Sequence, residues 1–146
     1  MTDRELLQAF ESQSIPRATW THRLHVRMAY LYLCQHSFDE ALARIRTGIQ
    51  RLNAANRVPE EPQVGAASTQ VGYHETTTVA WAHLIHTTLM EQGPAESSDE
   101  FVDRQPHLLC STLLRLYYSR AIWQEQDCRT NFIPPDLAPL PQPRSR

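Results

Sequence analysis

From Trp20 to His36 the chain reads WTHRLHVRMAYLYLCQH, and its apolar residues have the spacing of an α-helix with one buried face. At about 100° per residue, Arg23 and Arg27 fall on the same side, which we interpret as the solvent face. The opposite side carries a stripe at spacings of three and four residues: His22, His25, Ala29, Tyr32 and His36. The sequence therefore predicts histidines that face the protein interior.

Signals for further helices lie on both sides of this segment. Capping boxes at Thr2–Glu5 and Ser37–Glu40 predict helices that begin there, because the hydroxyl can accept a free N–H of the first turn. We expect others from about Tyr73 to Glu91, from Ser98 to Arg104, and from Pro106 onward. No segment alternates β-branched residues, and only four glycines are present. These features predict an all-α fold, a single-domain helical bundle.

Two segments do not have a helical pattern. Residues 56–71 combine prolines, Gly65 and small polar residues, which predicts a long inter-helix loop. From Phe132 onward the chain holds half of its ten prolines, so this part cannot be a helix. We therefore predict a helical bundle domain over residues 1–131 and an extended, Pro-rich C-terminal tail over residues 132–146 that straps across the bundle.

Composition limits the possible partners and the cellular compartment. The 146 residues include 14 basic and 16 acidic ones without a run of either sign, which argues against nucleic acid and anionic membranes as partners. All 14 basic residues are arginine, which excludes a Schiff-base lysine. The three cysteines lack a C-x-x-C spacing, the first residues lack the pattern of a signal peptide, and the longest apolar run is too short to cross a bilayer. We expect a cytoplasmic protein.

The histidines suggest metal chemistry. On the helix expected from Tyr73, the strongest apolar line runs through Trp81, and winding back by whole turns reaches His74, which therefore also points inward. Three inward imidazoles suit a divalent metal ion, with zinc, iron, manganese and copper as candidates. The sequence thus predicts a metal-dependent enzyme that acts on a small organic molecule, with His22, His25 and His74 as ligands. Glu75 would be a fourth ligand, a hydrogen-bonding partner of a ligand, or the general base.

Two alternatives use the same residues without a metal. In the first, the histidines are structural and the protein is a small-molecule-binding or accessory protein. In the second, His25 and Glu75 act as an acid–base pair on a substrate. Among the other candidates, we interpret His83 and His86 as solvated side chains, and Cys34 and Cys110 as small buried apolar residues.

Four strings in the chain resemble the motifs of an uncharacterised family of small bacterial proteins. They are WTHRLHVRMAYLYL, GYHET, LLRLYYSR and PPDLAPLP, of the W-T-H-x-x-H, G-Y-H-E-T and P-D-L-x-P-L type, and the resemblance covers most of the chain after residue 15. That family has no established activity, so the resemblance implies no reaction. It does imply that His22, His25, His74 and Glu75 occupy the family's motif positions, whereas His36, His83, His86 and His107 do not.

Overall fold

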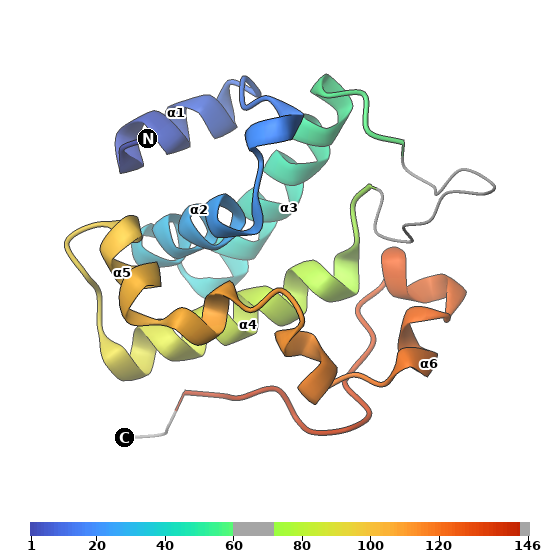
Figure 1. Ribbon diagram of the computed structural model, residues 1–146. Helices are drawn as coiled ribbons and strands as arrows, with labels where there is room; N and C mark the ends of the chain where they lie inside the picture. Colours follow the sequence, from blue (N-terminus) through green and yellow to red (C-terminus); the bar gives the residue numbers. More distant parts are fainter. Residues whose placement is uncertain (60–71, 144–146) are drawn as a thin grey trace.

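A computed structural model describes residues 1–59 and 72–143, and it confirms the all-α fold, with no strand among these residues (Figure 1). Residues 60–71 of the predicted inter-helix loop lie outside the described part. Among the described residues, none of the helices has the length and hydrophobicity needed to cross a bilayer. The elements in chain order are α1 (Asp3–Glu11), η1 (Arg17–Thr19), α2 (His22–Gln35), α3 (Phe38–Ala55), α4 (Glu75–Gln92), α5 (Ser98–Arg104), η2 (Pro106–Leu109), η3 (Leu113–Leu116), α6 (Arg120–Trp123) and η4 (Gln126–Arg129).

Helix α2 occupies the centre of the bundle. It contacts α1, α3, α4 and α5, and every residue from Val26 to Leu33 is buried (Figure 1). The prediction of a solvent face is therefore wrong for Arg27, which is only 4% exposed, and Arg23 is partly buried. The reason is that α1 and α5 also pack against α2, so the side opposite its apolar stripe is largely covered by protein.

The two predicted capping boxes are in place, and a third hydroxyl caps α2. Thr2 accepts the backbone N–H of Glu5 at 3.1 Å, and Ser37 accepts that of Glu40 at 3.3 Å. Thr21 does the same for Leu24 at the beginning of α2. Each hydroxyl satisfies one of the four N–H groups that a helix leaves unpaired at its beginning. These local signals fix where the helices begin, because they depend on residues only three positions apart.

The single helix predicted from Pro106 onward is wrong. The chain forms two separate 3-10 turns instead, η2 and η3, followed by the short helix α6 and the turn η4. Ser111 and Thr112 lie between the two turns, and such residues favour turns over helix interiors because their hydroxyls compete for backbone hydrogen bonds. The break allows Leu108 and Leu114 to be buried independently of helical spacing, at 0% and 6% exposure.

Residues 132–143, the described part of the C-terminal tail, are extended and strap across the bundle, as predicted. This segment crosses beside α4 in Figure 1, and hydrogen bonds join it to two separate parts of the chain, α4 and the segment after η3. The Tyr118 hydroxyl donates to the carbonyl of Ile133 at 2.8 Å, and Thr87 Oγ1 donates to that of Pro141 at 2.9 Å. The N–H of Leu137 donates to the Tyr117 carbonyl at 2.9 Å. The tail also buries the side chain of Leu140.

Candidate functional sites

His22 and His25 lie in the first turn of α2, and each is held by a backbone carbonyl. His22 Nε2 lies 2.8 Å from the Leu108 carbonyl, and His25 Nδ1 lies 2.8 Å from the carbonyl of Thr21. Because a carbonyl oxygen only accepts, these nitrogens carry the protons. Both rings also pack on tryptophans: His22 on Trp81 with centroids 4.6 Å apart, and His25 on Trp20 at 3.9 Å. One nitrogen of each ring is therefore used to position the ring.

His74 is the N-cap of α4. Its Nδ1 accepts the backbone N–H of Thr77 at 3.2 Å, so in the neutral ring the proton is on Nε2. Nε2 lies 3.4 Å from the Sγ of Cys128, and the ring packs edge-on against Trp123. The lone pair of neutral His74 thus points into the first turn of its own helix. A metal at Nε2 would require the other tautomer and would break the cap.

Glu75 is paired with residues other than the predicted histidines. Both of its carboxylate oxygens accept the Arg46 Nε–H, at 2.8 and 2.9 Å, and the Tyr73 hydroxyl donates to Oε1 at 3.0 Å. The ion pair with Glu75 raises the pKa of Arg46, while burial raises the pKa of Tyr73 to about 12. Glu75 therefore links the beginning of α4 to α3, which is a structural role.

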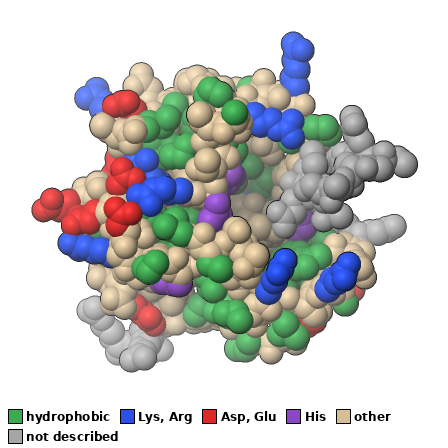
Figure 2. Space-filling view, viewed as in Figure 1, with side chains coloured by type: hydrophobic (Ala, Val, Ile, Leu, Met, Phe, Trp, Pro, Cys, Tyr) green, Lys and Arg blue, Asp and Glu red, His purple; other side chains and the backbone are tan. Residues whose placement is uncertain are grey.

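The four predicted site residues do not form one cluster. Within residues 1–59 and 72–143, no group of three or more His, Cys, Asp or Glu side chains is arranged to hold a metal ion. Figure 2 shows histidine side chains at several places on one face of the molecule. Together with the capping role of His74 Nδ1, this arrangement does not fit the predicted three-histidine metal site, and we derive no reaction step through a metal.

His74 and Cys128 are also not arranged as a nucleophile and its base. A general base must accept the thiol proton, but the accepting nitrogen of His74 is Nδ1, which faces the Thr77 N–H. Cys128 is 1% exposed, and burial raises the pKa of its thiol. The contact therefore stabilises the packing of η4 against α4.

Cys34 and Cys110 were both expected to be buried, and both are exposed. Cys34 lies at the end of α2, and Cys110 lies in the break between η2 and η3.

The second histidine pair on α4 is not solvated, contrary to the prediction. His83 and His86 are half-buried against Phe38, with ring centroids 4.6 and 5.2 Å away. Helical geometry placed both outside the Trp81 line, but the beginning of α3 covers that side of α4. His36, expected near the end of α2, is its C-cap and stacks on Tyr32.

The protonation of His25 is expected to be strongly shifted. Burial lowers its pKa from 6.5 to about 4, because the low-dielectric surroundings disfavour the charged ring. The unfolded chain therefore binds this proton first as pH falls. The stabilisation from neutral His25 is present above pH 6.5 and is lost progressively between pH 6.5 and about 4.

Titration of the histidine ring protons by NMR should give a pKa near 4 for His25. The variant His25→Phe should show a shallower loss of stability over that range. A normal pKa for His25 would contradict this expectation.

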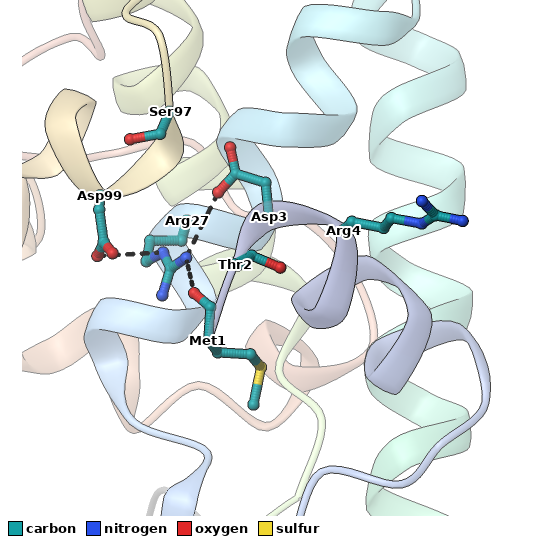
Figure 3. Close-up of a pocket in the computed structure, with 7 residues that line it drawn as sticks. All are labelled: Met1, Thr2, Asp3, Arg4, Arg27, Ser97 and Asp99. Carbon is teal, nitrogen blue, oxygen red and sulfur yellow. Dashed lines mark hydrogen bonds and ion pairs between the residues drawn. The ribbon is translucent and has the colours of Figure 1, made fainter.

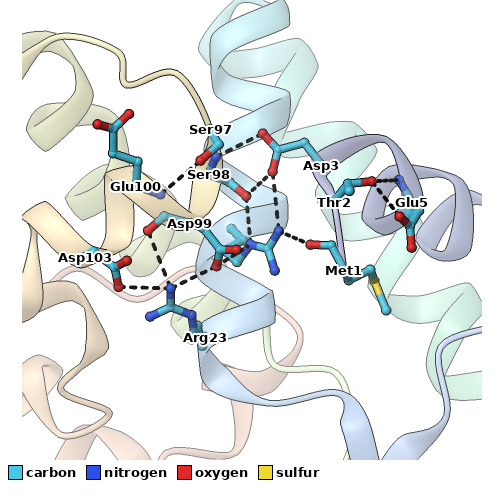
Figure 4. A network of polar contacts seen from close by, with 11 residues as sticks. Met1, Thr2, Asp3, Glu5, Arg23, Ser97, Ser98, Asp99, Glu100 and Asp103 are labelled. Atoms are coloured by element: carbon cyan, nitrogen blue, oxygen red, sulfur yellow. Dashed lines mark hydrogen bonds and ion pairs between the residues drawn. The ribbon is translucent and has the colours of Figure 1, made fainter.

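A polar network elsewhere in the bundle involves the buried Arg27. Its Nε donates to Ser98 Oγ at 2.8 Å, and its Nη2 donates to the Met1 carbonyl at 2.7 Å and to Asp3 Oδ1 at 3.4 Å (Figure 4). Asp3 in turn accepts the Ser98 backbone N–H at 2.9 Å, and Asp99 Oδ1 lies 3.5 Å from Arg27 Nε. The network joins the beginning of α1 and the beginning of α5 to the middle of α2.

A pocket of about 590 Å³ opens beside this network (Figure 3). Arg27 lines the pocket and keeps one nitrogen, Nη1, without a hydrogen bond among the described residues. Figure 3 shows Nη1 pointing away from Asp3 and Asp99. The residues that line the pocket are Met1, Thr2, Asp3, Arg4, Arg27, Ser97 and Asp99.

Sequence reasoning missed this pocket, because it assigned Arg27 to solvent. The apolar run from Met28 to Cys34 was the available signal, since a helix that is apolar around most of its circumference is surrounded by protein. An arginine next to such a run needs acidic or hydroxyl partners. Nothing in the spacing of Asp3, Ser98 and Asp99 identifies them as those partners, because they are far from Arg27 along the chain.

Comparisons of the chain with protein-family models, with curated proteins and with solved structures found no match.

Proposed function

We propose that this protein binds a small polar organic molecule, without a metal, in the pocket beside Arg27. The observation that supports this proposal is a buried guanidinium with one free nitrogen on the wall of a pocket of about 590 Å³. That volume is within the range of ligand pockets, about 300–1,000 Å³, and such sites orient their ligands with a few fixed polar groups.

The guanidinium is fixed before a ligand arrives. Two of the three nitrogens of Arg27 are held by the Met1 carbonyl, Asp3 and Ser98, so binding does not require the side chain to become ordered. An arginine this deeply buried is costly unless its donors have partners. A ligand that accepts a hydrogen bond from Nη1 would give all three guanidinium nitrogens of Arg27 a hydrogen-bonding partner.

Protein-observed NMR tests this function. We would titrate ¹⁵N-labelled protein with a panel of small polar molecules that are neutral, anionic, cationic or zwitterionic. We expect saturable shifts at the Ser98 amide and the Arg27 Nε–H for at least one member. A second cavity of about 330 Å³, lined by Phe10, Tyr32 and Gly48 among others, is an internal control. Shifts confined to that cavity, or none at all, would overturn the proposal.

Metal content tests the metal-dependent alternative. Because His74 Nδ1 caps α4 and no described cluster gathers three ligands, we expect the folded protein to retain no near-stoichiometric zinc or iron. The variants His25→Ala and His83→Ala should then give the same metal content as the unmodified protein. Stoichiometric metal that is lost in His25→Ala and kept in His83→Ala would instead support the sequence-based site.

A further inference from the structure

We propose that the ligand of this pocket is a small zwitterion of the amino-acid type, whose carboxylate binds Arg27 and whose ammonium group binds Asp99. This inference rests on the proposed function and adds the chemical class of the ligand. It follows from two polar groups that can each form a further hydrogen bond, and from the presence of both acidic and basic side chains on the pocket wall.

One free group is a donor and the other is an acceptor. Arg27 Nη1 has no hydrogen bond among the described residues, and a guanidinium N–H is well matched to a carboxylate oxygen. Asp99 uses Oδ1 for both Arg23 and Arg27, at 2.9 and 3.5 Å, and no hydrogen bond or ion pair from a described residue reaches its Oδ2. The hydrogen bond from Arg23 lowers the pKa of Asp99, so the carboxylate is ionised at neutral pH. Oδ2 can therefore accept from an ammonium group.

The side-chain charges that line the pocket cancel, since Asp3 and Asp99 are acidic and Arg4 and Arg27 are basic. The N-terminal ammonium of Met1 adds one positive charge, and the hydrogen bond from Arg23 together with this ammonium lowers the pKa of Asp99. Figure 2 shows acidic and basic side chains gathered together over α5 on the same side of the molecule. A ligand with one net charge would leave one of the two free groups without a partner. A neutral molecule that carries both charges satisfies both, and it adds no net charge to a region already held together by ion pairs.

The position of Asp99 is fixed without its side chain being buried. It lies in the first turn of α5, whose N-cap Ser97 accepts the N–H of Glu100 at 3.1 Å, and its side chain is 51% exposed. A ligand can therefore reach Oδ2 from solvent, while Arg23 holds Oδ1. Asp103 provides a matched control, because it also binds Arg23, at 3.0 Å, but does not line the pocket.

The test is a titration of ¹⁵N-labelled protein with the common amino acids, one at a time, with propionate and ethylamine as single-charge probes. We expect at least one amino acid to shift the Ser98 amide and the Arg27 Nε–H saturably, and to bind at least about tenfold more tightly than either single-charge probe. Asp99→Asn should weaken that binding at least about tenfold, whereas Asp103→Asn should leave it unchanged within about twofold.

The possible failures have different meanings. If propionate binds at Arg27 as tightly as any amino acid, the ligand is not a zwitterion, but the proposed function stands. The same conclusion follows if Asp99→Asn and Asp103→Asn change the affinity for the amino acid equally. If amino acids do not bind but another member of the polar panel does, the ligand class is again wrong. If nothing shifts the Ser98 amide, both the proposed function and this inference fail.

Discussion

The variant Arg27→Met is expected to lose about 1.5–3 kcal/mol of unfolding free energy, because it removes the buried, charged donor of hydrogen bonds to Ser98, the Met1 carbonyl and Asp3. Asp3 is the residue left without its partner, and Ser98 loses the N–H that Oγ accepts. In a domain of this size the loss corresponds to a drop in Tm of roughly 10 °C. Urea denaturation, followed by circular dichroism, measures the difference directly.

Arg23→Met is the matched control for this prediction. Arg23 lies one turn earlier on α2 and pairs with Asp99 and Asp103, but its side chain is 37% exposed. Exposed ion pairs contribute about 0–1 kcal/mol, so we expect a small change. Equal losses in the two variants, or an Arg27→Met protein as stable as the original, would show that the buried network does not stabilise the bundle.

Deletion of residues 132–146 is expected to reduce Tm by a similar amount, roughly 10 °C. It removes the buried Leu140 side chain, worth about 2–5 kcal/mol by the cost of truncating such residues, and the hydrogen bonds from Thr87 and Tyr118, at about 1 kcal/mol each. Differential scanning calorimetry of the shortened and full chains is the measurement.

Two leucines of the tail identify the cause of that loss. Leu140 is 8% exposed and Leu137 is 57% exposed. Leu140→Ala should therefore destabilise the protein by about 2 kcal/mol or more, and Leu137→Ala by less than about 0.5 kcal/mol. If neither substitution changes Tm, the tail does not contribute through the packing seen here.

Features that depend on neighbouring residues were predictable from sequence. The capping boxes at Thr2 and Ser37 identified helix beginnings, and the bounds predicted for α5, Ser98 to Arg104, agree with the structure. The prolines after Phe132 excluded a helix in the tail. The region after Pro106 was not predictable, because the turns there are set by where two leucines reach the core, which is a tertiary effect.

The candidate site was less predictable than the fold, for a physical reason. Helical spacing correctly indicated that His74 is near the beginning of a helix, but not that its ring would cap that helix. The same spacing placed Arg23 and Arg27 together on the solvent face, although only Arg27 is deeply buried in the structure. Helical spacing divides a helix into one apolar and one polar face. It therefore cannot predict which polar side chains are buried when several helices pack around it.

The central position of α2 also has a consequence for motion. Its backbone is covered by α1, α3, α4 and α5, so no local opening of one neighbour frees the amide hydrogens between Val26 and Leu33. We expect these amides to exchange with deuterium only when the entire domain unfolds, so that their exchange rate would report the global free energy of unfolding. The single turn of α6, by contrast, can open while α2 stays closed. We therefore expect conformational fluctuation to be concentrated at the periphery of the bundle, around a core that opens cooperatively.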